Sequence, residues 1–138
     1  DEGSWTSCHI RLDDIKDMLS TQVTPYWETH YAFGCESAKS KKHLSASSIN
    51  LLLINTVVPM LFAYGRHKQD DKLCDRAFDI LEQLRAEDNT IVRTWSEIGL
   101  GVENAGDSQA LIQLKKEYCD RRECLRCRFG YEYLKQKE

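Results

Sequence analysis

One stretch of this sequence limits its possible folds more than any other, because the residues from Ile49 to Phe62 are apolar on nearly every side of a helix. A helix that is apolar all round has to be covered by other elements. We therefore expect it at the centre of a helical bundle, running to about Tyr64, with one of the serines in residues 45–48 as its N-cap. Pro59 removes one backbone donor and crowds the carbonyl of the preceding turn, which predicts a kink.

The rest of the chain also favours helices. Its 138 residues include only two prolines and seven glycines, which argues against a many-turned β-sandwich, and no strand alternation stands out. Asp71–Ala86 is the clearest amphipathic helix, and Gly65 suits the end of the helix before it. Further helices are expected at residues 12–19, 26–31, 89–98, 107–118 and from 124 onward.

Together these patterns predict an all-α fold, an irregular bundle of five to six helices around the central, Pro-kinked helix. At this length the default is a single domain over residues 1–138. The chain begins with Asp rather than Met, so we expect it to be a C-terminal fragment of a longer protein. Its net charge of -3 excludes a general polyanion binder. No run of about 18 uninterrupted apolar residues is present, so we expect a cytoplasmic protein with no membrane association.

The most chemically specific feature is a cysteine cluster at residues 119–127, where Cys119, Cys124 and Cys127 follow a C-x4-C-x2-C pattern. The last two cysteines can share one side of a helix start, and the longer step lets a loop bring the first sulfur back to them. Three converging thiolates form a soft site that suits zinc or an iron–sulfur cluster. Basic neighbours are expected to lower the thiol pKa values and to offset the charge of a thiolate-bound metal: Lys115, Lys116, Arg121, Arg122, Arg126 and Arg128.

A tetrahedral centre needs a fourth ligand, and no cysteine follows Cys127. Cys74 is the first candidate for this metal ligand, because it lies beside the inward stripe of its predicted helix; Cys35, Cys8 or a histidine come next. The alternative for Cys74 is a small buried apolar residue. For the triad, the alternatives are reduced thiols without a metal or cofactor, and a disulfide or redox switch.

No catalytic constellation is visible within the chain. The histidines form no H-E-x-x-H pair, and neither a nucleophile motif nor a glycine-rich phosphate loop is present. A reactive thiol at Cys124 or Cys127 would lack an identifiable base. We therefore assign no catalytic residue, and whether the chain serves an enzyme stays open.

Two basic clusters could contact the phosphates of a nucleic acid. One follows an aromatic run that contains Tyr26, Trp27 and Tyr31, whose rings could stack on bases if they were exposed. The other surrounds the cysteine triad. The basic residues concerned are Lys39, Lys41, Lys42, Arg121, Arg122, Arg126 and Arg128. In the alternative interpretation, the lysines only solvate a loop and the aromatic rings belong to the core.

Five contiguous strings are distinctive, namely Tyr26–Tyr31, Asn55–Pro59, Leu61–Gly65, Asp107–Lys115 and Cys119–Gly130. Over roughly residues 12–134 the chain resembles the C-terminal part of an uncharacterised bacterial family, the domain of unknown function numbered 2851. Members of that family are longer, and their N-terminal part is similar to PD-(D/E)xK nuclease cores. None of the acidic residues of that core is in this chain. The resemblance implies a helical accessory domain beside a nuclease-like part.

Two functions from different classes follow. In the first, zinc or an iron–sulfur cluster joins the last helices of an accessory domain that assists a nucleic-acid-acting partner region. In the second, the domain binds no metal and docks onto the remainder of its own longer chain or forms a homodimer. The second function predicts an exposed apolar patch among Trp5, Tyr26 and Trp27.

Overall fold

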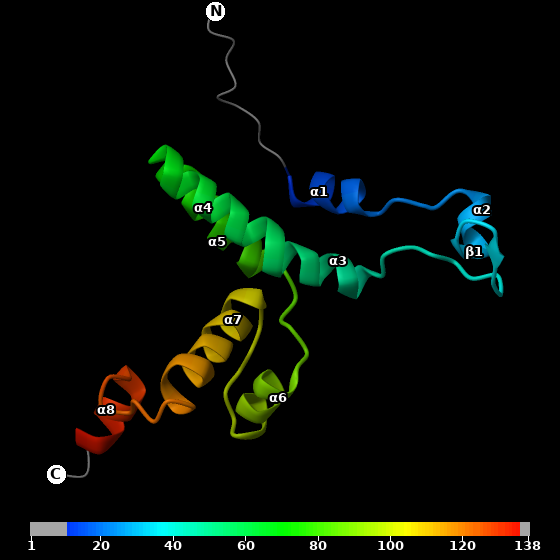
Figure 1. The fold of residues 1–138 in the computed structure, drawn as a ribbon. Coiled ribbons are helices and arrows are strands. Elements are labelled where there is room, and N and C mark those ends of the chain that lie inside the picture. The colour runs from blue at the N-terminus through cyan, green and yellow to red at the C-terminus, as the bar shows by residue number, and fades with distance from the viewer. Residues whose placement is uncertain (1–10, 136–138) are drawn as a thin grey trace, which may run out of the picture. The chain divides into compact units, whose positions relative to one another are not determined.

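The computed structural model describes residues 11–135, and this part of the chain is mostly helical (Figure 1), which confirms the all-α class. Within it, one small two-stranded sheet interrupts the helices. The chain divides into two compact units, one up to Leu53 and one from Ile54 onward, and each is described separately below. Two residues named above, Trp5 and Cys8, lie outside the described residues.

The first unit contains short elements joined by long connections. They are α1 (Leu12–Leu19), α2 (Pro25–Glu28), β1 (His30–Ala32), β2 (Cys35–Glu36) and α3 (Ala46–Leu52).

The helix expected over residues 26–31 ends early, and the prediction that these residues contain no strand is wrong. Pro25 starts α2 at its first turn, where a missing N–H costs nothing. After Glu28 the chain forms an antiparallel hairpin, in which His30 pairs with Glu36. Gly34 has a φ of 73°, a conformation that reverses the chain at no steric cost for glycine alone. This turn explains why the aromatic run forms a strand rather than a second helical turn.

The long apolar helix is continuous from Ala46 to Lys68, through α3, the π-helix η1 (Leu53–Val57) and α4 (Val58–Lys68). The Ser45 hydroxyl caps its start by accepting from the Ser48 N–H at 3.1 Å, as predicted. The disturbance expected at Pro59 takes the form of η1, which ends directly before the proline turn. A wider turn accommodates a residue that cannot donate to the preceding carbonyl.

The position predicted for this helix, at the centre of a bundle, is wrong in the part of the chain that the structure describes. Only 17% of its most apolar window is buried, and the side chain of Met60 is 68% exposed. By length and composition alone, with a mean hydropathy of 1.7 over that window, its 23 residues are sufficient to cross a membrane. The expectation of no membrane association stays a prediction.

The second unit is organised around an antiparallel pair formed by α4 and α5 (Asp71–Gln83), which lie side by side in Figure 1. Gly65 does not end α4 as expected. The helix continues to Lys68 and stops at Gln69, which has a left-handed φ of 56°. Gly65 is instead buried against α5, where a Cβ atom would lie 2.9 Å from the sulfur of Cys74.

The remaining elements of the second unit are α6 (Thr90–Glu97), α7 (Ala105–Gln113), the π-helix η2 (Leu114–Cys119) and α8 (Arg128–Lys135). The cap predicted at Asn89 is confirmed, because its side chain accepts from the Val92 N–H at 3.0 Å. Asn104 rather than Asp107 caps α7.

The end of α5 is joined to the start of α7 by polar contacts. The Ala105 N–H donates to the Leu84 carbonyl at 2.9 Å. The fully buried hydroxyl of Ser108 donates to the Ala105 carbonyl at 3.0 Å and accepts from the Glu87 N–H at 3.2 Å. These bonds fix α7, and through it the π-helix that leads to the cysteine cluster.

Candidate metal centre

The three cysteines of the triad line one cavity of about 270 Å³ in the second unit. Cys127 is buried, whereas Cys119 and Cys124 are exposed as whole residues. The other lining residues are mainly apolar: Trp95, Leu100, Leu111, Leu114, Tyr118, Phe129 and Gly130. The structure therefore brings together the residues of the C-x4-C-x2-C pattern around a space that one water molecule, with a share of roughly 30 Å³ in the liquid, would not fill.

The first cysteine is placed by an irregular helix. α7 continues into η2, and Cys119 is the last residue of that π-helix. A backbone bond from the Asp120 N–H to the Lys115 carbonyl, at 2.9 Å, closes the wide turn. Short π-helical segments often occur at functional sites, because the extra residue per turn changes the direction of the side chains that follow.

The second and third cysteines are placed by a tight loop between η2 and α8. The Glu123 N–H donates to the Tyr118 carbonyl at 2.9 Å, and the Cys127 N–H donates to the Glu123 carbonyl at 3.1 Å. Arg122 adopts a left-handed φ of 56° in this loop, which is uncommon for a non-glycine residue. The sequence predicted that the last helix begins near Cys124. Because this loop occupies residues 120–127, α8 begins only at Arg128.

Gly130 lets α8 approach the loop. A Cβ atom at this position would lie 3.1 Å from the Cα atom of Cys124 and still closer to its carbonyl oxygen. Because these are backbone atoms, they could not move aside as a flexible side chain does. The absence of a side chain at Gly130 is thus a condition for the close packing of α8 on the cysteine loop.

Burial and the neighbouring thiolates raise the pKa of the Cys119 thiol. The largest cause is desolvation, followed by repulsion from the sulfurs of Cys127 and Cys124, while Lys115 partly opposes both. Although Cys119 is exposed as a residue, its desolvated thiol agrees with its place in the cavity wall. This repulsion also indicates that the three sulfurs are near one another.

The expectation that basic neighbours lower the pKa of the triad thiols is wrong for Cys119. Several of these side chains are engaged with carboxylates. Arg121 lies 2.9 Å from Glu117, Arg126 lies 2.9 Å from Glu123, and Lys115 pairs with Asp120. Their charges are therefore largely compensated before they can act on the sulfurs.

Cys74, the first candidate for a fourth ligand, is not brought to the triad. It is buried between α4 and α5, where its thiol lies 3.8 Å from the Phe62 carbonyl, and it does not line the cavity. This position is that of the small buried apolar residue considered above. Cys35 lies in the first unit, in β2.

No three His, Cys, Asp or Glu side chains in residues 11–135 are placed so that they could hold one metal ion. The sequence predicted three sulfurs that share one ion. The structure places them instead around a larger space, without a fourth donor among the described side chains.

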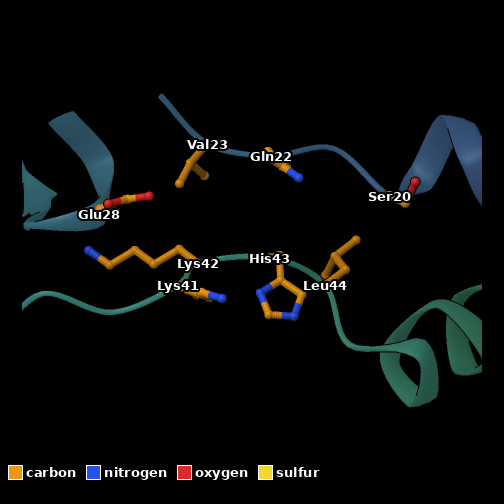
Figure 2. Close-up of a pocket in the computed structure, with 8 residues that line it drawn as sticks. All are labelled: Ser20, Gln22, Val23, Glu28, Lys41, Lys42, His43 and Leu44. Carbon is orange, nitrogen blue, oxygen red and sulfur yellow. The ribbon is translucent and has the colours of Figure 1, made fainter. Parts of the chain in front are cut away.

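Two lysines of the first basic cluster, Lys41 and Lys42, line a different cavity, of about 510 Å³, in the first unit. Figure 2 shows two extended segments that face each other, with Val23 on one and Lys41, Lys42 and His43 on the other. Glu28 also lines this cavity.

The lysines of this cluster are partly occupied. Lys39 pairs with Glu28 at 3.1 Å, and Lys42 donates to the His30 carbonyl at 2.6 Å while lying over the ring of Tyr31. Tyr26 stacks on His30, with 4.0 Å between ring centroids. Lys39 and Lys41 are exposed and Lys42 is half-buried, while the aromatic rings pack on one another without being fully buried; contact with a nucleic acid stays a prediction.

Sequence analysis missed two residues at the cysteine site. Trp95 lines the cavity from α6, and its indole nitrogen is buried without a hydrogen-bond partner among the described residues. Gly130 packs on Cys124 from α8. Neither residue belongs to a spacing motif with the cysteines. The only sequence signal for Trp95 is its residue type, because a buried tryptophan N–H usually needs a hydrogen-bond partner.

The comparisons with known proteins give one match. A family model described as "Protein of unknown function (DUF2851)" matches residues 4–90. No curated protein and no solved structure matches the chain. The matched residues amount to more than half of the chain and include the aromatic run and the long apolar helix, whereas the cysteine triad lies beyond them.

Proposed function

Since this chain belongs to the DUF2851 family of proteins of unknown function, its activity has to be argued from its own residues, and we propose that its second unit binds a thiolate-ligated metal centre, zinc or an iron–sulfur cluster. The ligands are Cys119, Cys124 and Cys127. The observation that carries the proposal is that all three line one largely apolar cavity.

The electrostatics of the cavity support this function. Desolvation raises the pKa of the Cys119 thiol, and repulsion from the neighbouring sulfurs of Cys127 and Cys124 raises it further. A bound metal cation removes that repulsion and replaces the protons, so metal binding and thiol deprotonation are coupled. The role is structural or cofactor-binding: a centre at this place joins the end of η2 to the start of α8.

The experiment is metal analysis of the chain purified without oxygen. Zinc and iron are measured in the wild-type chain, in the variants Cys119→Ser, Cys124→Ser and Cys127→Ser, and in Cys35→Ser as the matched control. The proposal expects about one metal centre per chain in the wild type and in the control. Each triad variant is expected to lose this metal. A wild-type chain without metal that is as stable with a chelator as without one would contradict it.

The accessory role implied by the family resemblance is part of this proposal: a C-terminal helical part of a longer bacterial protein, beside a nuclease-like region. We do not extend it to direct nucleic-acid contact by this chain, because Lys39, Arg121 and Arg126 each pair with a carboxylate. The chain alone is expected to show no salt-sensitive binding to duplex DNA. Binding that weakens steeply with salt would contradict this exclusion.

The second candidate function is a metal-free dimerisation domain. It is supported by apolar side chains on the α4–α5 pair that are more than half exposed, namely Met60, Tyr64 and Phe78. The patch expected among Trp5, Tyr26 and Trp27 is less clear, since Trp27 is half-buried. Sedimentation of the wild-type chain and of Met60→Glu tests this function. A dimer that Met60→Glu dissociates favours it, and a monomeric wild type at high concentration excludes it.

A further inference from the structure

The cavity of the first unit has a chemistry unlike that of the cysteine cavity, because cationic side chains line one of its walls. We propose that it binds a small organic phosphate, whose phosphate group is held by the side chains of Lys41, Lys42 and His43. This proposal goes beyond the proposed function, since it concerns another class of ligand in another part of the chain.

The cavity lies between two connections, one that follows α1 and one that leads from the hairpin to α3 (Figure 2). The Ser40 N–H donates to the Glu28 carbonyl at 2.9 Å, and Lys39 pairs with the Glu28 carboxylate at 3.1 Å. The Lys42 ammonium donates to the His30 carbonyl at 2.6 Å. These contacts hold the second connection against α2 and the hairpin, so the basic segment starts at a defined place.

Lys42 carries a charge that its neighbours hold in position without neutralising it. Its ammonium contacts a neutral carbonyl and lies 3.4 Å from the centroid of the Tyr31 ring, and the residue is half-buried. An ammonium has three donors, so the bond to His30 leaves two for another acceptor. Among residues 11–135, no carboxylate lies within ion-pair distance of Lys42. A partly desolvated cation of this kind favours an anionic ligand.

Lys41 and His43 add donors from the same segment. They are two residues apart, and Figure 2 shows both side chains on the same side of that segment. In the described part of the chain, neither side chain has a hydrogen-bond or ion-pair partner. Glu28 supplies the one carboxylate among the described lining residues, and Lys39 already pairs with it. The cavity therefore has an excess of positive charge along one wall.

This donor set fits a phosphate better than a carboxylate. Lysine binds phosphate as a point charge, whereas the fork of an arginine gives the most specific recognition of a carboxylate. No arginine is among the described residues that line the cavity. A phosphomonoester carries about two negative charges at neutral pH, which the two lysines balance.

The size and the apolar part of the lining indicate an organic phosphate rather than the free ion. The volume of about 510 Å³ lies within the range of roughly 300–1,000 Å³ that is usual for small-molecule sites. Val23 and Leu44 also line the cavity and offer apolar surface. A carbon skeleton attached to the phosphate would contact this surface, and inorganic phosphate would not.

The first experiment titrates the full chain with phenyl phosphate, inorganic phosphate and phenol, followed by calorimetry and by backbone amide NMR. We expect one phenyl phosphate per chain, with shifts concentrated in residues 20–44, and at least about tenfold weaker binding of the other two compounds. Equal affinity for inorganic phosphate or for phenol would overturn the proposal. So would the absence of binding, or shifts centred elsewhere in the chain.

The second experiment repeats the phenyl phosphate titration with charge-removing variants. Lys41→Gln is expected to weaken binding by roughly tenfold, because it removes one hydrogen bond to a charged group. Lys41 is exposed, so this variant is expected to fold. Lys72→Gln removes the same charge from an exposed position in the second unit and should leave the affinity unchanged. Equal losses in the two variants would show unspecific attraction and overturn the site.

The third experiment distinguishes a small phosphate from larger sources of the same group, with duplex DNA and phosphatidic acid vesicles as probes. We expect neither to bind as tightly as phenyl phosphate. Tighter binding of either probe, lost in Lys41→Gln, would assign the lysines to that probe and overturn the small-molecule site. Cys124→Ser is expected to keep the phenyl phosphate affinity, so failure of the metal proposal and failure of this one are separate results.

Discussion

Gly130 packs directly on the backbone of Cys124, so that α8 and the cysteine loop touch without an intervening side chain. Gly130 and the three cysteines line the same cavity. This packing gives the first prediction.

Gly130→Ala is expected to open the cysteine loop. The added methyl group meets backbone atoms of Cys124, and relief of such a clash costs about 1–3 kcal/mol. We expect a lower midpoint of chemical unfolding and a lower metal content. Gly101→Ala is the control, because a Cβ atom at Gly101 has no neighbour within 4 Å. Equal metal content in the two variants would contradict the role of this contact.

Gly65→Ala is expected to destabilise the α4–α5 pair. In an exposed helix this substitution stabilises by up to about 1 kcal/mol, because alanine is the better helix former. Here the new Cβ atom would lie 3.0 Å from the Cys74 nitrogen and 3.0 Å from the Leu73 Cβ atom. The free energy of unfolding should therefore fall, and a rise would show that the two helices do not pack as closely as described.

Ser108→Ala is expected to lower the free energy of unfolding by about 1–3 kcal/mol. The substitution removes the acceptor of the Glu87 N–H in a fully buried position. Ser96→Ala is the control, since the exposed Ser96 hydroxyl donates only to Val92 of its own helix. Urea unfolding of both variants makes the comparison, and equal effects would exclude a specific role of Ser108.

The metal-free chain is expected to lose stability at alkaline pH through Cys119. The pKa of this thiol is raised in the folded chain, whereas an unfolded cysteine has a pKa of about 8.5. The folded state therefore holds the proton more tightly, and its contribution to stability is complete below about pH 8.5 and is lost as the pH rises toward the folded value.

Alkylation of Cys119 at a series of pH values, followed by mass spectrometry of its peptide, measures this difference. The reaction midpoint should lie at higher pH in the folded, metal-free chain than in the same chain in urea. A midpoint at equal or lower pH would contradict desolvation of this thiol.

Local chemistry made part of this fold predictable. The caps at Ser45 and Asn89 followed from side chains that accept backbone N–H groups, and the amphipathic α5 followed from its periodicity. The three cysteines line one cavity, as their spacing suggested, but the described residues include no group of three ligands placed to hold one metal ion. Each of these features depends on residues close together in sequence.

The features that could not be predicted depend on tertiary packing. Gly65 looked like a helix end because glycine often occupies that position, yet it is the contact point of two helices. Cys74 carries a thiol that could ligate a metal, but it is surrounded by core residues. The long apolar helix was expected to be covered, yet only 17% of its most apolar window is buried. The pattern of apolar residues along a helix does not show which other elements pack against it.

The central claim is that Cys119, Cys124 and Cys127 bind one metal centre together. The most direct test is alkylation of the native, anaerobically purified chain, read separately for each cysteine by mass spectrometry. The account predicts that all three thiols are protected together, that a strong chelator exposes them together, and that Cys35 reacts at once in both cases. A triad cysteine that reacts as fast as Cys35 before the chelator is added would contradict it.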